Sequence, residues 1–323
     1  MKIDLSKRIK DYANKHILVI GDVMLDKYIF GEIDRVSPEA PVPIIREKKI
    51  NFNLGGAANV ARNIEGLGGK VSLIGLIGKD SAGERLKSII NKDSDRINYN
   101  FIEEKSLHTT VKTRIIGQGQ HIARLDRESK CNSIPSLIRT LKKNIGLYIN
   151  EVNGIILQDY DKGVLSEELI EFVMEQSLSK SIPVYVDPKN KYFSLYEGAR
   201  FFKPNQFEFK KEISTNDDII SAGIAFRKKL NLDILMVTMS EKGMYLFQED
   251  RHNHIKTKAR SVHDVSGAGD TVISAFALND ICGADPYESA YISNIAAGRV
   301  CEEIGVVPIT ESIITEIINH HTK

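Results

Sequence analysis

The sequence of 323 residues predicts an α/β fold: three α/β/α layers around a mostly parallel central sheet, with a small β lid. Two observations lead to this prediction. Apolar runs typical of buried strands alternate with segments of helical period, as in parallel sheets covered on both faces. Short β-prone segments interrupted by proline lie outside this alternation, and they predict a separate flap.

The first half of the chain supplies the first strands, the first helices and the flap. The apolar run HILVIGDVMLD, ending in a glycine and an acid, predicts a buried strand followed by a loop. The next segment carries Pro38, Pro41 and Pro43 and is interpreted as the first part of the lid. The following elements are predicted as a helix in 55–68, a strand at 70–78, a helix at 82–91, and two strands in 109–126 with a tight turn at Gly117 to Gly119. The lid therefore comprises about 28–50 and 107–127.

The second half alternates more regularly between strands and helices. The predicted elements are strands at 154–160 and 182–189, a helix at 166–180, a short strand and turn in 200–209, two strands around a turn in 233–247, and helices at 267–280 and 287–304. Neither an internal repeat nor a low-complexity linker separates these segments. We therefore expect residues 1–323 to form a single domain plus the lid.

Composition excludes several classes of protein. The formal net charge is +1, from 44 basic and 43 acidic side chains, so neither nucleic acid nor a membrane surface is indicated as a partner. The three cysteines are scattered without a CxxC motif, which argues against zinc or a disulfide framework. The N-terminal segment lacks the apolar core of a signal peptide, and no run reaches the ~18 apolar residues that span a bilayer. A cytoplasmic protein is expected.

The stretch DVSGAGDTVISAF places Gly267, Ala268 and Gly269 at the start of a predicted helix, directly before Asp270. The first N–H groups of a helix lack partners within it, and together with the helix dipole they favour an anion such as phosphate. A carboxylate beside that anion is well placed to accept a proton from an attacking hydroxyl. The alternative is a tight turn that caps an ordinary helix, with Asp270 favoured there by the dipole.

A second glycine pair, Gly55 and Gly56, opens another predicted helix with Asn59 in its first turns. These two stretches, about two hundred residues apart and with KPNQFE between them, resemble the two signatures of the ribokinase-like (PfkB) carbohydrate kinases. The resemblance covers essentially the whole chain and implies that family's fold, a central sheet with a β lid. The sequence contains neither a GxxxxGK[ST] P-loop nor a GxGxxG dinucleotide motif.

Within this family the segments GDVMLDKYIFGEIDRVSPEAPVPI, DYDKGVL, VDPKN and HDVSGAGDTV resemble the bacterial heptose 7-phosphate kinases. The resemblance implies ATP-dependent phosphorylation of the anomeric hydroxyl of D-glycero-β-D-manno-heptose 7-phosphate to the 1,7-bisphosphate, on the route to ADP-heptose for lipopolysaccharide. Such kinases are often fused to a nucleotidyltransferase with an HxGH motif, which this sequence lacks, so a stand-alone kinase is expected. The sequence departs from these relatives at Gln158 and Asp161, where smaller residues are expected.

The resemblance also implies roles for individual residues. Asp270 corresponds to the catalytic base, and the turn of Gly267, Ala268 and Gly269 to the anion hole. The sugar hydroxyls are expected at Asp22, Asp26, Gly55, Gly56 and Asn59. The nucleotide is expected at Lys189, Asn205, Glu208, Thr238, Ser240, Gly243 and Asn294, with Glu208 organising Mg²⁺ through water. Asp264 lies in the region where the family often binds a monovalent cation such as K⁺. Ordinary structural roles, a strand-end cap for Asp26 and a surface turn for Asn205 and Glu208, are the alternatives.

A substrate that already carries a phosphate needs a basic cluster at its far end. The candidates are Arg35, Lys112, Arg114, Arg124 and Lys162. Charges on a strand more commonly form a solvated face, so we expect at least two of the five to bind the phosphate. The lid is expected to exclude water on closing and to pair with a second lid in a homodimer.

Two rival functions remain open at this point. One is a kinase of the same fold that acts on another sugar or sugar phosphate. The other is a non-catalytic sensor of a sugar or nucleotide, against which the presence of Asp270 argues, because binding alone needs no base.

Overall fold

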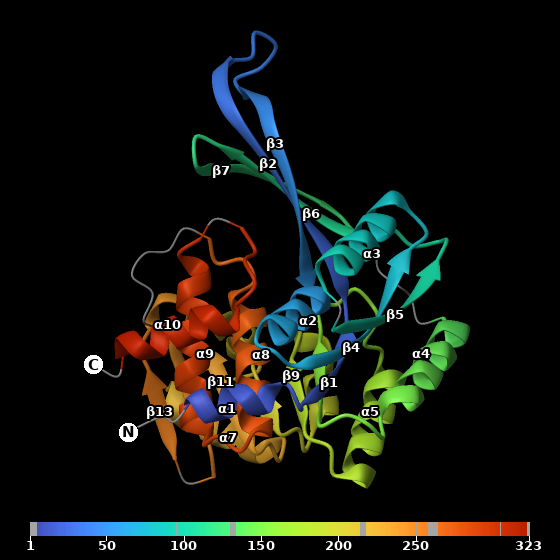
Figure 1. Cartoon of the computed structure of the whole chain (residues 1–323), viewed down its shortest axis with the longest axis vertical. Helices are drawn as coiled ribbons and strands as arrows, with labels where there is room; N and C mark the ends of the chain where they lie inside the picture. Colours follow the sequence, from blue (N-terminus) through green and yellow to red (C-terminus); the bar gives the residue numbers. More distant parts are fainter. Residues whose placement is uncertain are drawn as a thin grey trace.

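The computed structural model describes residues 5–94, 96–129, 134–213, 218–249, 251–257, 264–303 and 305–321. In this part of the chain the main body is built on a nine-stranded sheet of order β13-β12-β11-β10-β9-β8-β1-β4-β5 (Figure 1). Only β12 pairs antiparallel, with β11 and β13, and all other pairs are parallel. The predicted α/β fold with a mostly parallel sheet is confirmed. The strands are β1 (His16–Gly21), β4 (Lys70–Gly78), β5 (Ile97–Glu104), β8 (Gly154–Gln158), β9 (Val184–Asp187), β10 (Phe201–Phe202), β11 (Ile234–Thr238), β12 (Met244–Phe247) and β13 (His252–Ile255).

The sheet divides the core into two apolar layers. Along β1, Ile17 and Val19 join one buried cluster while Leu18 and Ile20 join the other, because successive side chains of a strand point to opposite faces. The first cluster is covered by α1 (Leu5–Tyr12), α2 (Ala57–Gly66), α3 (Ser81–Asp93), α8 (Ala268–Ile281), α9 (Pro286–Cys301) and α10 (Glu311–His321). The second is covered by α4 (Pro135–Tyr148), α5 (Glu167–Lys180), η1 (Asn190–Tyr196), α6 (Gln206–Lys210) and α7 (Ile219–Lys229).

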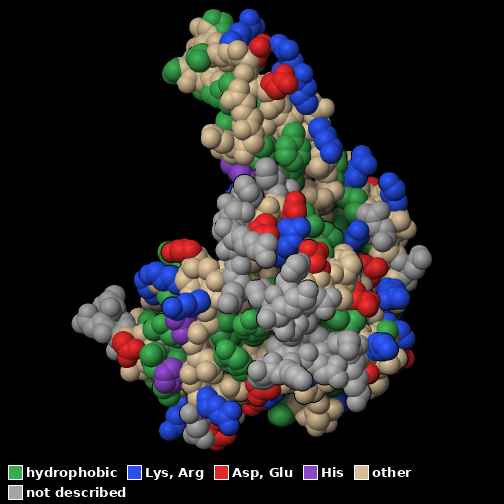
Figure 2. Space-filling view, turned by 60° about the vertical axis from the view of Figure 1, so that its left-hand side comes forward, with side chains coloured by type: hydrophobic (Ala, Val, Ile, Leu, Met, Phe, Trp, Pro, Cys, Tyr) green, Lys and Arg blue, Asp and Glu red, His purple; other side chains and the backbone are tan. Residues whose placement is uncertain are grey.

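A four-stranded sheet of order β3-β2-β6-β7 projects from this body, and we call it the lid (Figures 1 and 2). Its strands are β2 (Val23–Val36), β3 (Pro43–Gly56), β6 (Thr110–Gly117) and β7 (Gln120–Arg127). The loop expected after the first strand is a single residue, Asp22, because β2 begins immediately after it. Pro38 and Pro41 lie in the connection between β2 and β3, and Pro43 is the first residue of β3, so neither long strand is interrupted.

Several elements were not predicted from the sequence, namely α1, β5, α4, η1, α6, α7, β13 and α10. In the described part of the chain, no helix combines the length and apolar character needed to cross a membrane.

The chain order of the strands marks one edge of the large sheet as the place for a site. From β1 the chain proceeds through the lid to β4 and β5 on one side, and later to β8, β9, β10 and β11 on the other. In open α/β sheets, ligands bind outside the carboxyl ends of the strands at such a point of reversal. Helices α2 and α8 both begin near this edge, where Asn59 and Asp270 come into contact.

Candidate active site

Asp270 lies in the first turn of α8 and is almost fully buried. Its Oδ2 accepts a hydrogen bond from Asn59 Nδ2 at 2.8 Å, and its Oδ1 accepts from the Tyr160 hydroxyl at 2.9 Å and Gln158 Nε2 at 3.1 Å. Burial raises the pKa of Asp270 to about 7, although the bonds from Asn59 and Tyr160 lower it. A carboxyl group with such a pKa is suited to accept a proton at neutral pH.

A chain of polar contacts leads from Asp270 to a buried lysine. Gln158 Nε2 also donates to Asp187 Oδ2 at 3.0 Å, and Lys203 Nζ lies 3.0 Å from the same oxygen. Because the Gln158 amide nitrogen faces two carboxylates, its buried Oε1 has no hydrogen-bond partner among the described residues. These contacts bring the Lys203 ammonium group next to Gly269, since a Cβ built on Gly269 would lie 3.3 Å from Lys203 Nζ.

The glycine turn before Asp270 requires glycine at one position in particular. Gly267 precedes the first residue of α8 with φ 81°, in the left-handed region that other residues rarely adopt. A Cβ on Gly267 would lie 2.8 Å from Asn59 Nδ2. The turn therefore combines the N–H groups of a helix start, of which that of Ala268 donates to the Val265 carbonyl at 3.3 Å, with the nearby Lys203 ammonium group and the Asp270 carboxylate. This arrangement suits transfer of an anionic group.

The Gly267→Ala variant tests this close approach. We expect it to lower kcat at least about tenfold, since the new methyl group displaces Asn59 from Asp270, and to cost about 1–2 kcal/mol of stability from the strained φ. Gly283→Ala is the matched control, because Gly283 has φ 80° just after α8 and no described atom lies within 4 Å of its Cβ position. Thermal unfolding should show a similar loss in both variants, and an equal loss of kcat in both would contradict the expectation.

Asp22 is used within the protein rather than exposed toward a ligand. Its Oδ2 accepts from the backbone N–H groups of Tyr160 at 2.8 Å and Lys162 at 3.1 Å, and its Oδ1 accepts from that of Val164 at 3.2 Å. Burial raises the pKa of this carboxyl group despite the three bonds. Asp22 was predicted as a sugar ligand, and in the structure its three hydrogen bonds fix the loop that carries Tyr160.

The inner end of the lid contributes a buried ion pair. Asp26 on β2 pairs with Arg114 on the neighbouring strand β6, and the Arg114 guanidinium also lies 5.2 Å from the Tyr28 ring. Burial raises the pKa of Asp26 even with Arg114 against it. Gly55 leaves room for this carboxylate, because a Cβ there would lie 2.3 Å from Asp26 Oδ2.

The five basic candidates differ in position. Lys112, Arg114 and Lys162 lie near Tyr160 and Asp26, whereas Arg35 is exposed, nine residues along β2 from Asp26, or roughly 30 Å at the usual rise per residue. The structure does not bring Arg35 to this cluster.

The basic candidates also differ in their ionic partners. Lys162 pairs with Glu128 at 2.7 Å and Arg124 with Asp126 at 2.9 Å. Lys112 forms no ion pair with a described residue, and burial lowers its pKa. Lys112 is therefore the partly desolvated cation of the cluster that is left for an external anion.

The predicted nucleotide residues gather at the carboxyl ends of β9, β10 and β11. Asn205 caps α6 by accepting from the Glu208 N–H at 2.9 Å, and Glu208 Oε2 accepts from the Asn205 N–H at 2.9 Å. The other Glu208 oxygen pairs with Lys189. Burial alone lowers the pKa of Lys189, but this ion pair outweighs burial and raises it.

The remaining predicted nucleotide residues serve mainly the local backbone. Thr238 ends β11 and bridges to Asn205, and Ser240 begins the short helix η2 (Ser240–Lys242). Gly243 has φ 87°, and a Cβ there would lie 2.0 Å from the Ile255 carbonyl oxygen. Asn294 on α9 donates to the Lys256 carbonyl at 2.7 Å. Of these residues, Thr238 lies directly beside Asn205.

Asp264 joins two segments near the glycine turn. Its oxygens accept from the N–H groups of Ser266 at 2.9 Å and Gly305 at 3.2 Å and from the Tyr28 hydroxyl at 3.3 Å. Burial alone raises the pKa of Asp264, but the bonds from Ser266 and Gly305 hold it below its usual value. In the described ranges, no group of three or more His, Cys, Asp or Glu side chains forms a site for a metal ion.

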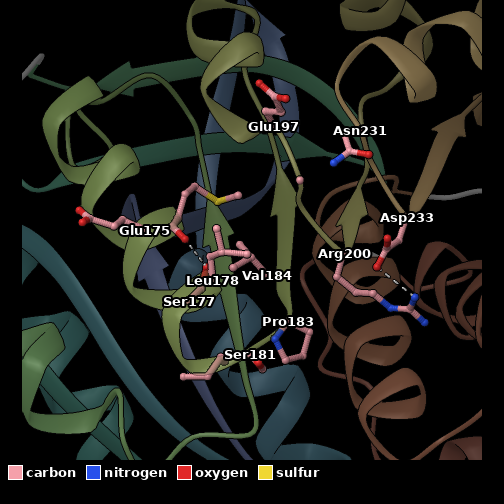
Figure 3. A pocket seen from close by; sticks show the side chains of 13 residues that line it. Glu175, Ser177, Leu178, Ser181, Pro183, Val184, Glu197, Arg200, Asn231 and Asp233 are labelled. Carbon is pink, nitrogen blue, oxygen red and sulfur yellow. Dashed lines mark hydrogen bonds and ion pairs between the residues drawn. The ribbon is translucent and has the colours of Figure 1, made fainter.

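A groove of about 610 Å³ lies at the opposite, amino ends of the strands (Figure 3). Val184 at the start of β9 and Arg200 before β10 line it, together with Leu178 of α5. The groove contains none of the predicted site residues, so the polar cluster around Asp270 remains the candidate active site.

Three side chains of the cluster were not predicted to be functional: Tyr160, Asp187 and Lys203. Gln158 was singled out only as a departure from relatives. Their common signal is position, because Gln158 and Asp187 end β8 and β9, and Lys203 directly follows β10. A polar residue at the carboxyl end of a buried parallel strand is the pattern that would have identified them.

Comparisons with known proteins agree with this geometry. A family model described as pfkB family carbohydrate kinase matches residues 14–312. The chain is 38% identical over 311 residues to the bifunctional protein HldE of Helicobacter hepaticus, covering 95% of this chain and 64% of that protein. It is 36% identical over 301 residues to the D-beta-D-heptose 7-phosphate kinase of Bordetella bronchiseptica, covering 92% of this chain and 94% of that protein. The chain therefore spans just under two thirds of the first relative and nearly all of the second.

Solved structures support the fold. Phosphofructokinase-2 from Escherichia coli in complex with potassium superimposes with a TM-score of 0.78 at 18% sequence identity. The match covers 96% of this chain and 99% of that chain. At this identity the likeness concerns the fold alone, and it agrees with the three-layer arrangement and the projecting sheet.

Proposed function

The chain belongs to the pfkB family of carbohydrate kinases, and from this premise we propose that it transfers the γ-phosphoryl group of ATP to the anomeric hydroxyl of D-glycero-β-D-manno-heptose 7-phosphate. The observation that carries the proposal is the buried Asp270 carboxylate beside the glycine turn that begins α8. The named relatives support heptose 7-phosphate as the acceptor.

Asp270 is the base of the proposed reaction. The anomeric O–H of the sugar donates its proton to the Asp270 carboxylate while the oxygen forms a bond to the γ-phosphorus. The bond between that phosphorus and the β–γ bridging oxygen breaks, and ADP leaves with the bridging oxygen. The proton held by Asp270 passes to solvent when the bisphosphate departs.

The transferred group needs donors that compensate its negative charge. The N–H groups of Gly269 and Asp270 lie in the first turn of α8, where helix N–H groups lack intrahelical partners, whereas the Ala268 N–H donates to the Val265 carbonyl at 3.3 Å. Lys203 approaches Gly269 from the side of Asp187. Removing one such donor in other enzymes lowers turnover by about 10²–10³-fold. We assign the anion hole to the amides of the turn and add Lys203 as its nearest buried cation.

The sugar lies, in this proposal, between the lid and the start of α2. Asn59 faces Asp270, and Asp26 faces Gly55, so a carboxylate and an amide are available to hydroxyl groups that both donate and accept. Gly56 has φ 57° and lets the chain pass close to the Asp22 backbone. The Asp26–Arg114 pair is available to orient the ring hydroxyls from the lid side.

The phosphate at the far end of the substrate is assigned to Lys112, with Lys162, Arg114 and Arg124 close to it. Lys112 is the strongest candidate, because the other three already face Glu128, Asp26 and Asp126. A partly desolvated ammonium group that forms no ion pair with a described carboxylate is available to bind a phosphate dianion.

The Lys112→Met variant is expected to raise the KM for the sugar phosphate by about 10–100-fold, as for a lost charge-assisted hydrogen bond, with little change in kcat. Initial rates with the 7-phosphate and with the same heptose lacking that phosphate should separate the effects. The variant should be impaired only with the phosphorylated sugar. Lys27→Met, on the adjacent strand against Phe52, is the control and should behave as wild type. Equal impairment with both sugars would remove Lys112 from the phosphate site.

ATP is assigned to the carboxyl ends of β9, β10 and β11, beside Lys189, Asn205 and Glu208. Both Glu208 oxygens are engaged, by Lys189 and by the Asn205 N–H, which fits contact with Mg²⁺ through water and not as a direct ligand. Bound Mg²⁺ would neutralise charge on the β- and γ-phosphates. We assign K⁺ to the segments joined by Asp264, supported by the neighbour solved with potassium.

We also propose that two copies pair through their lids, since Val36, Val42 and Leu125 of the lid are exposed to 66%, 51% and 67%.

The test of the function is ATP turnover with D-glycero-β-D-manno-heptose 7-phosphate, compared with ribose, fructose, fructose 1-phosphate and fructose 6-phosphate. Phosphorus NMR should show a new anomeric phosphate. Turnover only with another acceptor would support the kinase activity and would exclude heptose 7-phosphate as the acceptor.

A further inference from the structure

The hydrogen bonds around Asp270 are distributed unequally between its two oxygens. Tyr160 and Gln158 both donate to Oδ1, at 2.9 Å and 3.1 Å, whereas Asn59 is the one described donor to Oδ2. A carboxylate oxygen accepts about two hydrogen bonds. Oδ1 is therefore filled by the protein, and Oδ2 keeps one place for a further donor.

Tyr160 is held rigidly in this arrangement. The buried Asp22 carboxylate accepts from the backbone N–H groups of Tyr160, Lys162 and Val164. Within the same loop, Asp161 has φ 56° and donates its N–H to Asp159 Oδ1 at 2.8 Å. A loop fixed at so many points presents the Tyr160 hydroxyl as a preorganised donor.

The ring of Tyr160 is also close to two lysines, one from the lid and one from the proposed nucleotide side. Lys112 Nζ of the lid is 5.8 Å from the ring centroid, and Lys189 Nζ of the proposed nucleotide side is 5.6 Å from it. Both distances are within the range of cation–π attraction. The ring therefore stands where the proposed sugar-phosphate and nucleotide sides meet.

We propose that Tyr160 is a positioning residue which, together with Gln158, occupies Oδ1 of Asp270 and so directs the acceptor hydroxyl to Oδ2. The inference rests on Asp270 being the base of the proposed function. Oδ2 is the oxygen that faces Asn59 and the start of α2, the side assigned to the sugar. The loop anchored by Asp22 thus determines which lone pair of the base receives the proton.

Removing the Tyr160 hydroxyl should shift the pKa of Asp270 in a predictable direction. The hydroxyl donates to the charged carboxylate, so its loss makes the charged form less favourable and raises the pKa of Asp270. The other groups that face Asp270 are unchanged by this substitution: Asp187 raises its pKa, while Lys203 and the hydrogen bond from Asn59 lower it. The base is then protonated over a wider acidic range.

The test compares Tyr160→Phe with Tyr185→Phe in the full chain. Tyr185 donates to Asp280 at 2.7 Å near the other end of α8, so its variant removes the same kind of bond away from the site. In Tyr160→Phe the acid limb of the kcat–pH profile should move up by about one pH unit. The KM for the sugar phosphate should remain within about threefold of wild type. In Tyr185→Phe the limb should not move.

A titration of the Asp270 carboxyl carbon by ¹³C NMR, assigned through Asp270→Asn, provides a readout without catalysis. Its midpoint should rise in Tyr160→Phe and stay in Tyr185→Phe. An unchanged midpoint in Tyr160→Phe, or equal shifts in both variants, would overturn the inference. A wild-type protein that turns over no sugar phosphate would overturn the proposed function instead, so the two failures are distinguishable.

Discussion

Asp270→Asn is expected to lower kcat by about 10²–10⁴-fold, the usual contribution of a general base, while both substrates still bind. The amide keeps the shape of the side chain but cannot take up the proton of the sugar hydroxyl. Loss of a group that acts only in the transition state lowers kcat without raising KM. Single-turnover kinetics and equilibrium titration with ATP and the sugar phosphate would measure the two effects separately.

Unfolding does not explain such a loss. Because burial raises the pKa of Asp270 to about 7, far above the value of 3.8 for an exposed carboxyl group, the folded protein prefers an uncharged group there. The stability that accompanies this raised pKa is present below about pH 4 and is lost as the pH rises toward 7. A neutral amide avoids this loss, but its NH2 group must face one of the donors that the carboxylate accepts from. Thermal unfolding of Asp270→Asn at neutral pH should therefore show a loss of no more than about 1–3 kcal/mol, with the protein still folded at the assay temperature.

Asp218→Asn supplies the control for the chemistry. Asp218 caps α7 at its N-terminus, where Asn caps equally well, so turnover should remain at the wild-type level. A fall in kcat confined to Asp270→Asn, with binding retained, supports the kinase and argues against a sensor. Full turnover in Asp270→Asn would remove Asp270 as the base and with it the proposed mechanism.

The meeting of Asn59 and Asp270 could be anticipated from the sequence, because both belong to glycine-led helix starts. In an α/β sheet such helices begin at the carboxyl edge of the strands, so motifs two hundred residues apart come together. The Asn205–Glu208 pair was predicted from the resemblance of KPNQFE to the family's motif, and it forms a capping box in the structure. A site residue can be recognised in the sequence when it stands next to residues that a particular backbone conformation requires.

Other features depended on tertiary register, which the sequence does not display. Arg35 was one of the five basic candidates for the substrate phosphate, but β2 runs from Val23 to Val36 and places Arg35 far along the strand from Asp26. Lys112 reaches the site because it lies opposite Asp26 where β2 and β6 pair in parallel. This register is set by contacts between segments that are far apart in the chain. Tyr160 and Lys203 sit in loops whose direction is fixed only by the folded neighbours.

Asp22 was predicted to bind the sugar, and in the structure its carboxylate fixes the loop that carries Tyr160. Its substitution is the second change for which we expect a large effect. Asp22→Ala is expected to destabilise the protein by about 3 kcal/mol, taking about 1 kcal/mol for each of three N–H groups left without a partner. The donors are the N–H groups of Tyr160, Lys162 and Val164. Chemical denaturation followed by circular dichroism would measure the loss.

Asp285→Ala is the matched comparison, since Asp285 is an exposed cap of α9 that accepts one backbone bond, from Tyr287 at 2.9 Å, and its loss should cost about 1 kcal/mol. At a temperature where Asp22→Ala remains folded, it should lower kcat, because the loop that presents Tyr160 to Asp270 loses its anchor. A sugar ligand at this position would behave differently: its removal would raise the KM for the sugar selectively and leave the free energy of unfolding nearly unchanged. That second pattern would return Asp22 to the sugar site and would weaken the assignment of Tyr160 as a fixed donor, because both depend on the same three hydrogen bonds.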